Sequence, residues 1–239
     1  MSEGRFVLHE LRVPDVVESA RFYAELFGWN ATDTPVGKLL RAGDTIVGGV
    51  STVKQNIPVH WGGYVAVTDV VATAAIAKEY GGIVTTQDGE PANAPGRGWV
   101  APILDPDNKV VFLITEPRPA AAPEIGTFVW DRLHAADPAA SAAFYQNVLP
   151  WTPFPRTDGA AGGFRLGDGT MVADMVPAGD GRPRWSSYVL VEDLDDARDR
   201  ASGLGATVVI ERAQFPAGSG DLCVLTDPQG AEIGLCQAS

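Results

Sequence analysis

The chain repeats itself, and this duplication limits the possible folds more than any other feature. The segment "LRVPDVVESARFYAELFGW" (residues 11–29) returns 122 residues later as "LHAADPAASAAFYQNVLPW" (residues 133–151). Two shorter segments return in the same order, "WGGYVAVTD" as "WSSYVLVED" and "LDPDN" as "TDPQG". Because the three matches keep their order at a nearly constant offset, the sequence predicts two homologous halves.

Each half divides again into two similar segments. An aspartate follows a short apolar segment and precedes a helical pattern at four places, Asp15, Asp69, Asp137 and Asp193. A carboxylate at this position accepts hydrogen bonds from the first N–H groups of a helix and complements the helix dipole. Short β-type segments separated by turn residues follow each helix. The sequence therefore predicts four β-α-β-β-β modules, each of about 60 residues.

The composition is typical of a folded protein and argues against several classes of partner. Hydrophobic residues make up 45% of the chain, and 18 Lys and Arg against 30 Asp and Glu leave a net charge of −12. This charge repels phosphate backbones and anionic membrane surfaces, so we expect neither a nucleic acid nor a membrane as partner. The sequence has no apolar run of membrane-spanning length and no signal-peptide pattern. We expect a cytoplasmic monomer or homodimer whose two cysteines, Cys223 and Cys236, are thiols.

The repeated motifs resemble those of the vicinal oxygen chelate superfamily, which includes glyoxalase I, bleomycin-resistance proteins and extradiol dioxygenases. The motifs are "SARFYAELFGW", "WGGYVAVTD" and "DPDNKVVFL", and the resemblance covers nearly the whole chain, most closely to tandem glyoxalase-like proteins. It implies an α+β fold in which paired βαβββ modules form two domains. Each domain is expected to be an eight-stranded mixed sheet, curled into a cup with flanking helices. The expected boundaries are 1–118 and 127–239, with a linker at 119–126, but the sequence leaves open whether modules pair within one half or exchange partners across the duplication.

The resemblance also implies where metal ligands would lie. In metal-dependent members, His and Glu ligands point into the cup from the first and last strands of a module. The corresponding positions lie seven residues before each helix-capping aspartate and seven after each Asp-Pro aspartate, and they hold Leu8, Gly62, Trp130, Ser186, Phe112 and Gly234. On the middle strands, only Asp174 could be a ligand. Because a catalytic metal needs about three protein ligands, we expect no metal site and no cofactor.

His9 lies one residue away from the first-strand ligand position. Side chains alternate between the two faces of a strand, so His9 is expected to share a face with Leu11 and Val13 and to pack toward the helices. A β-bulge would reverse this assignment. His60 and His134 have the inward parity, but neither has a ligand partner at the family's spacing.

The same alternation predicts which side chains line the cups. The candidate ligand-binding residues are Leu8, Glu10, Arg12, Tyr64, Phe112, Trp130, Arg132, His134 and Tyr188, and Phe6 and Phe128 share their parity. Aromatic surface with a few polar groups is typical of a small-molecule site. The small residues Gly62, Ser186 and Gly234 are expected to leave room for a ligand. The alternative is that the aromatic side chains fill the cups.

These features favour a metal-free protein that binds a small, apolar or aromatic molecule, of the sequestration or resistance type. The alternative is a metal-dependent enzyme of the superfamily: a lyase such as glyoxalase, an epimerase or an extradiol dioxygenase. That enzyme would need a divalent metal at a non-standard site. A third hypothesis is an enzyme that uses Glu10 or His134 as a general acid or base without a metal. The sequence identifies no catalytic residue.

Overall fold

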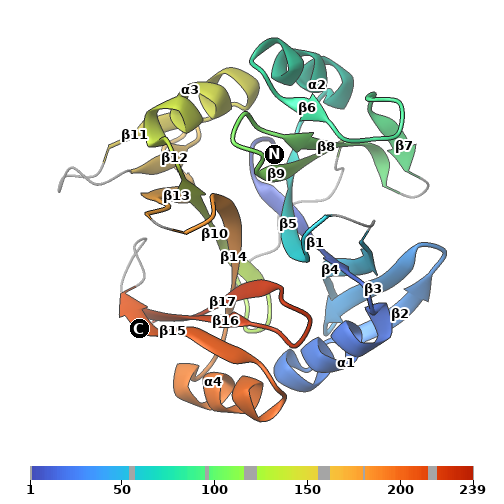
Figure 1. The fold of residues 1–239 in the computed structure, drawn as a ribbon, viewed down its shortest axis with the longest axis vertical. Coiled ribbons are helices and arrows are strands. Elements are labelled where there is room, and N and C mark those ends of the chain that lie inside the picture. The colour runs from blue at the N-terminus through green and yellow to red at the C-terminus, as the bar shows by residue number, and fades with distance from the viewer. Residues whose placement is uncertain are drawn as a thin grey trace. The chain divides into compact units, whose positions relative to one another are not determined.

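The computed structural model describes residues 2–53, 57–94, 97–115, 123–155, 162–179, 181–214 and 220–238 (Figure 1). Within these residues it contains four helices and seventeen strands, arranged as four modules that each begin with a strand followed by a helix. Of the linker expected at 119–126, residues 119–122 lie outside the described residues.

The four modules follow one another along the chain. The first comprises β1 (Phe6–Val13), α1 (Val16–Phe27), β2 (Asn30–Thr34), β3 (Gly37–Ala42) and β4 (Thr45–Thr52). The second comprises β5 (His60–Ala66), α2 (Val70–Glu79), β6 (Ile83–Val84), β7 (Ala92–Ala94), β8 (Gly98–Leu104) and β9 (Val110–Ile114). The third comprises β10 (Phe128–Ala135), α3 (Pro138–Val148), β11 (Thr152–Phe154), β12 (Gly163–Arg165) and β13 (Met171–Pro177). The fourth comprises β14 (Arg184–Leu190), α4 (Leu194–Gly203), β15 (Thr207–Gln214), β16 (Gly220–Thr226) and β17 (Glu232–Ala238).

The strands form two sheets. The first has the order β2-β3-β4-β1-β5-β9-β8-β6, with the additional strand β7 paired to β8, and the second has the order β11-β12-β13-β10-β14-β17-β16-β15. The first and last strands of each module run parallel, as β1 and β4 do, whereas hairpin neighbours such as β8 and β9 are antiparallel. The predicted α+β class with βαβββ modules and mixed sheets is confirmed.

The predicted helix caps are present in all four modules. Oδ1 of Asp15 accepts hydrogen bonds from the N–H groups of Val17 and Glu18, both at 2.9 Å. The other three caps accept equivalent bonds at 2.8–3.0 Å through the carboxylates of Asp69, Asp137 and Asp193. Each aspartate thus begins its helix by satisfying N–H groups that have no partner within the helix.

The chain divides into two compact units, and each unit combines modules from both halves. Unit 1 contains the second and third modules, and its ranges are Met1–Val7, Gly63–Ala120 and Asp131–Trp185. Unit 2 contains the first and fourth modules, and its ranges are Leu8–Gly62, Ala121–Trp130 and Ser186–Ser239. Helices α2 and α3 are in contact within unit 1, as α1 and α4 are within unit 2 (Figure 1). The sheets therefore follow the two halves of the chain, whereas the hydrophobic cores join modules across the duplication.

The repeated Phe-Tyr and Trp motifs build the centres of both cores. In unit 1, the hydroxyl of Tyr145 donates to Asp105 Oδ2 and accepts from Trp185 Nε1, both at 2.9 Å. In unit 2, the hydroxyl of Tyr23 makes the same two bonds at 2.9 Å with Asp227 and Trp61. Burial, reinforced by the neighbouring carboxylate, raises the pKa of both tyrosines well above the usual value. The motifs that reveal the repeat are thus structural.

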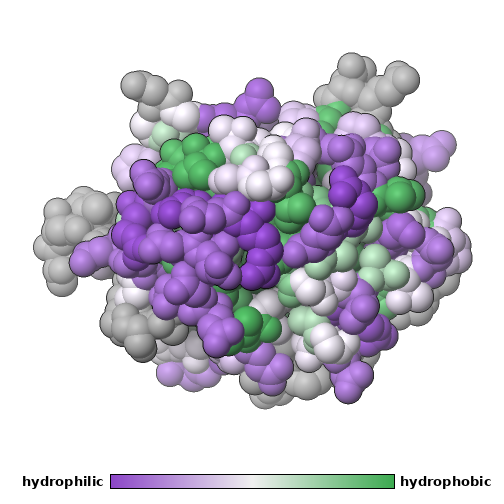
Figure 2. Space-filling view, turned by 90° about the horizontal axis from the view of Figure 1, so that it is seen from below, coloured by the Kyte–Doolittle hydropathy of each residue, from purple (hydrophilic) through white to green (hydrophobic). Residues whose placement is uncertain are grey.

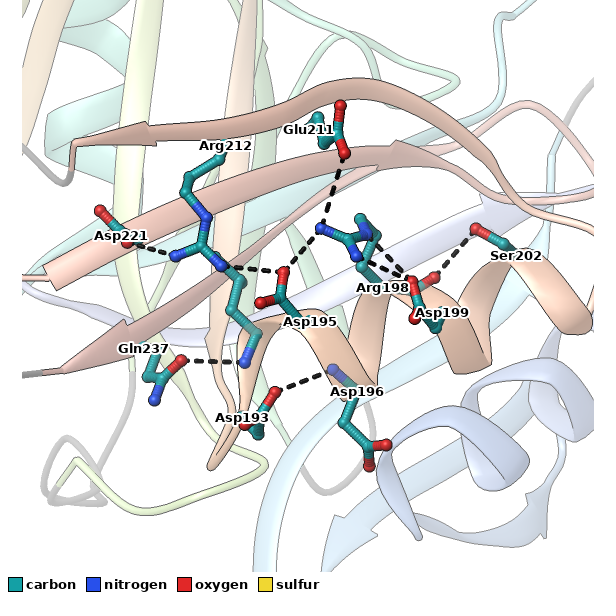
Figure 3. A network of polar contacts seen from close by, with 11 residues as sticks. Asp193, Asp195, Asp196, Arg198, Asp199, Ser202, Glu211, Arg212, Asp221 and Gln237 are labelled. Carbon is teal, nitrogen blue, oxygen red and sulfur yellow. Dashed lines mark hydrogen bonds and ion pairs between the residues drawn. The ribbon is translucent and has the colours of Figure 1, made fainter.

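The surface of unit 2 near α4 is strongly charged. Seen from the side of α1 and α4, hydrophilic residues gather over the part of the surface where α4 lies (Figure 2). Arg198 pairs with Asp195 at 2.7 Å and with Asp199 at 2.9 Å, while Arg212 pairs with Asp195 at 2.8 Å and also with Asp221 (Figure 3). These exposed pairs contribute little stability individually. Their charges also cover β15, the last strand of its sheet, and disfavour pairing with another chain.

Both cysteines are buried thiols, as predicted. Burial raises the pKa of Cys236 to about 12 and that of Cys223 to about 11, so both thiols are protonated and poorly nucleophilic at neutral pH. Among the described residues, none of the four helices has the length and apolar character needed to cross a membrane.

Candidate ligand-binding faces

The two faces of each first strand have different surroundings. On β1, Leu11 and Val13 pack in the core of unit 2 with Phe22 and Tyr23 of α1. Because side chains alternate along a strand, Leu8, Glu10 and Arg12 lie on the opposite face. We call this the cup face of β1, and we use the same term for the face of the other strands that is opposite to their helix-packed side.

His9 lies on the helix-packed side of β1, as predicted. Its side chain is buried, and its ring stacks on Phe128 with the ring centroids 4.0 Å apart and an interplanar angle of 22°. Phe128 in turn contacts Trp29 and Trp61 in the core of unit 2. His9 therefore belongs to an aromatic core.

The prediction that Phe6 and Phe128 line the cups is wrong. Phe6 packs against Trp151 and Trp185 in unit 1, as Phe128 packs against tryptophans in unit 2. Both residues precede the part of their strand that pairs with the last strand of the same module, which begins at His9 in β1 and at Arg132 in β10. Phe6 and Phe128 are also the first residues of β1 and β10, and the alternation does not predict where a side chain at the very start of a strand packs.

A buried carboxylate organises the cup face of β1. Glu10, which is 4% exposed, accepts a hydrogen bond from Ser51 Oγ at 2.5 Å and pairs with Arg12 Nη2 at 3.0 Å. Ser51 reaches Glu10 because β1 and β4 are parallel neighbours whose register places Arg12 beside Ser51. His60 on β5 lies within the electrostatic influence of both charges, and burial lowers its pKa. Its Nδ1 lies 2.7 Å from the carbonyl oxygen of Pro58.

The cup face of β10 also carries an ion pair, but here the arginine is on the first strand and its carboxylate partner is on the neighbouring strand β13. Arg132 donates from Nε at 2.9 Å and from Nη2 at 2.8 Å to the carboxylate of Asp174. The two residues are direct partners on the parallel strands β10 and β13, and their side chains are 12% and 4% exposed. Asp174, the one candidate metal ligand on the middle strands, thus binds a guanidinium. Paired charge-assisted hydrogen bonds of this kind fix the positions of both side chains.

His134 lies two residues after Arg132 on the same face of β10. Its Nε2 is buried, and it is the one such side-chain nitrogen or oxygen among the described residues that has no hydrogen-bond partner. Burial, followed by the positive charges of Arg184 and Arg132, lowers the pKa of His134 to about 3. The imidazole is therefore neutral at pH 7.

This pKa predicts a specific dependence of stability on pH. The unfolded chain binds a proton at His134 below its ordinary pKa of about 6.5, whereas the folded protein does so only near 3. The contribution of His134 is therefore complete above pH about 6.5 and decreases as the pH falls toward 3. Urea unfolding should show that His134→Asn loses less stability than the original protein between pH 7 and pH 4.5. An imidazole that titrates near pH 6.5 by NMR would contradict this expectation.

Stacked aromatic rings occupy the cup faces of the second module. Tyr64 and Phe112 are direct partners on the parallel strands β5 and β9, with ring centroids 4.6 Å apart and an interplanar angle of 20°. Both residues are buried, at 3% and 5% exposure.

In the fourth module, the ring of Tyr188 covers Gly234, its partner on β17. A Cβ atom on Gly234 would lie 2.1 Å from a ring carbon of Tyr188, so only glycine fits beneath the ring. Trp130 packs against the same cluster, which also contains Leu222, Val224 and Cys236. The expectation that Gly234 leaves room for a ligand is wrong, because the alternation pattern does not show where a neighbouring ring folds. Ser186 is also engaged, since its hydroxyl donates to Glu232 at 2.7 Å.

The predicted site residues therefore form separate clusters. Glu10 and Arg12 are together, as are Arg132 and His134, Tyr64 and Phe112, and Tyr188 and Trp130, while Leu8 is buried on the cup face of β1. Whether they bind a ligand stays a prediction. Sequence reasoning missed Ser51, Arg184 and Glu232. The repeat contains one signal for Arg184, because it precedes Trp185 as His60 precedes Trp61.

The donor set does not fit the metal centre that the fold implies. The six strand positions that correspond to ligands hold no His, Cys, Asp or Glu. Among the described residues, no group of three or more such side chains could hold a metal ion.

Comparison with known proteins finds a family model that matches the second half of the chain and relatives that match nearly all of it. The model of a glyoxalase-like domain matches residues 127–236. CFP32 of Mycobacterium tuberculosis, which is named as a glyoxylase, is 29% identical over 239 residues, covering 93% of this chain and 90% of that protein. The anthracycline biosynthesis protein DnrV of Streptomyces peucetius is 28% identical over 260 residues, covering 95% of this chain and 91% of DnrV.

Solved structures share the fold over nearly the whole chain. A Mn(II)-bound glyoxalase from Novosphingobium aromaticivorans has a TM-score of 0.70 at 16% identity, covering 99% of this chain and 82% of that chain. Homoprotocatechuate 2,3-dioxygenase from Arthrobacter globiformis has a TM-score of 0.71 at 16% identity, covering 99% of this chain and 80% of that chain. At this identity the likeness shows the fold alone.

Proposed function

Because residues 127–236 match a glyoxalase-like domain and the fold is shared with a glyoxalase, we propose that this chain is a member of the vicinal oxygen chelate superfamily that binds a small organic molecule on its cup faces without a catalytic metal. The single observation that carries the proposal is which side chains the cup faces hold. The positions that correspond to metal ligands hold apolar or small residues, while the carboxylates of Glu10 and Asp174 are buried on the same faces. Such a combination of apolar surface and a few oriented polar groups suits a small-molecule site.

Two ion pairs with buried carboxylates support this function. Glu10 and Arg12 form a charged pair on β1, and Arg132 of β10 forms one with Asp174 of the neighbouring strand β13. Taking charges out of water is costly and is compensated only by good geometry. A ligand that hydrogen-bonds to these prearranged groups avoids ordering them itself, which favours binding. In this proposal the protein holds a compound without converting it, as in sequestration or resistance, and acts in the cytoplasm as a monomer or homodimer.

The alternative is a metal-dependent enzyme. It is favoured by the similar structures, one of which is titled as a Mn(II)-bound glyoxalase and another as a dioxygenase. Such an enzyme would need a divalent metal at a site made from other donors than those of the family. An enzyme with a general base is less favoured. His134 has a pKa of about 3 and so has little affinity for a proton at neutral pH, and Glu10 is engaged by Ser51 and Arg12.

The first test is metal content combined with binding. The protein is purified without chelators and without a polyhistidine tag, then examined by elemental analysis and native mass spectrometry. We expect far less than one metal ion per chain, and either a co-purifying organic molecule or a thermal shift with neutral aromatic compounds. A His60→Gln variant identifies metal that is held by this single imidazole rather than by a group of ligands. Stoichiometric manganese, iron, nickel or zinc that survives this substitution would support the enzyme instead.

A further inference from the structure

A buried nitrogen without a hydrogen-bond partner, Nε2 of His134, indicates what kind of group the third module binds. In native proteins nearly all buried polar atoms have a hydrogen-bond partner, and an exception needs an explanation. Among the described residues, Nε2 of His134 is the one buried side-chain polar atom that has none. His134 is on the paired segment of β10, where its backbone is in register with Val176 of β13. The geometry therefore leaves one directed hydrogen bond for a bound molecule to complete.

The groups around His134 favour an acceptor with negative charge. Arg132 is on the same face of β10, and β10 lies between β13 and β14 in its sheet, where Arg184 begins β14. The two charges that act most on the imidazole are those of Arg184 and Arg132. Asp174 compensates much of the charge of Arg132, so Arg184 is the group that chiefly attracts an anion and opposes a metal cation here. The neutral imidazole can still donate through Nε2–H in the corresponding tautomer.

We propose that the cup face of β10 binds the carboxylate of a small organic acid, which accepts a hydrogen bond from His134 Nε2–H beside the guanidinium groups of Arg132 and Arg184. The inference rests on the proposed binding function and narrows it to a chemical class of ligand. Arg184 becomes a recognition residue in addition to those predicted from the sequence. The Arg132–Asp174 pair holds one guanidinium at a defined position next to the imidazole.

The first module has no equivalent site. The residues that correspond to Arg132 and His134 in the repeat are Glu10 and Arg12. The first half of the chain also has His60 at the position that corresponds to Arg184, so the first module lacks that guanidinium to attract an anion near its Arg12-paired carboxylate, Glu10. The histidine nearest to it, His60, already has the carbonyl oxygen of Pro58 at Nδ1. The expected stoichiometry is one carboxylate per chain.

The test uses the full chain at pH 7 with benzoate as the probe and benzamide as its uncharged counterpart. Isothermal titration should show one benzoate per chain, bound roughly tenfold or more tightly than benzamide. His134→Phe keeps a ring but removes the donor, and it should remove this preference. Arg165→Gln is the matched control, because it deletes a positive charge from the exposed side of β12 in the same unit, and it should leave benzoate binding unchanged.

A second measurement needs no substitution. In ¹⁵N-labelled protein, the His134 imidazole should show the Nε2–H tautomer, and its ¹⁵Nε2 signal should move with benzoate and stay in place with benzamide. If benzoate and benzamide bind equally, or if benzoate binds while the His134 signal is unchanged, the carboxylate assignment is overturned and the proposed function stands. If neither probe nor any neutral aromatic compound binds, the proposed function itself fails.

Discussion

Replacing Arg132 with methionine should lower the free energy of unfolding by about 3–5 kcal/mol, because the buried Asp174 carboxylate would lose its guanidinium partner. The pair is nearly enclosed, with side-chain exposures of 12% and 4%, and joins adjacent strands through several short bonds. A methionine of similar length cannot donate to the carboxylate. Urea unfolding at pH 7, with the slope m as a check on cooperativity, measures the change.

Two further variants make this result interpretable. The double variant Arg132→Met with Asp174→Leu should recover most of the lost stability, because replacing a whole buried pair with apolar residues is often neutral. Arg165→Met, on the exposed side of β12, should change stability by less than about 0.5 kcal/mol. A loss below about 1 kcal/mol for Arg132→Met alone would show that water reaches Asp174 and that the ion pair is not enclosed.

The second large effect is expected at Tyr188 and Gly234. Tyr188→Ala should destabilise the protein by about 3–5 kcal/mol, since it deletes a ring that is 1% exposed and leaves a cavity over β17. Gly234→Ala should cost about 1–3 kcal/mol, because its Cβ would meet the ring at 2.1 Å and the ring or the strand must shift.

The two substitutions should not be additive. Once the ring is absent, the space above Gly234 is open, so Gly234→Ala should cost much less in the Tyr188→Ala background than alone. A double-mutant cycle by chemical unfolding measures the difference. Additive changes would mean that the ring moves aside without strain, and the cup face of β17 would then be adaptable enough to admit a ligand there.

The ring over Gly234 also explains why the former ligand position does not behave as an open slot. A glycine or a serine at a metal-ligand position removes the donor, but the space can be taken up by neighbouring side chains. Here Tyr188 covers Gly234, and Ser186 is bonded to Glu232. The cup faces of the first and third modules differ from this arrangement, because each carries an ion pair whose hydrogen-bonding groups have fixed directions. We therefore expect ligand recognition to depend chiefly on those two faces.

The candidate site could be predicted in part. Alternation along β1 and β10 correctly separated Glu10 and Arg12 from Leu11 and Val13, because a paired strand has a strict two-residue period. It failed at Phe6 and Phe128, which lie before the segment paired with the last strand of their module. It also did not identify Ser51 as the partner of Glu10, since that contact depends on the register between β1 and β4.

By itself, the sequence determined the four modules, the starts of the helices and the apolar face of each first strand. These properties depend on periodicity and on hydrogen bonds between residues a few positions apart, so they can be read along the chain. Only the tertiary structure decided that the first module shares its core with the fourth, where Tyr23 binds Asp227 across 204 positions of sequence. It also decided that Nε2 of His134 is buried without a hydrogen-bond partner among the described residues and that Tyr188 covers Gly234. Each of these depends on side chains from separate strands, and such side chains meet only when the sheets are aligned and the cores are closed.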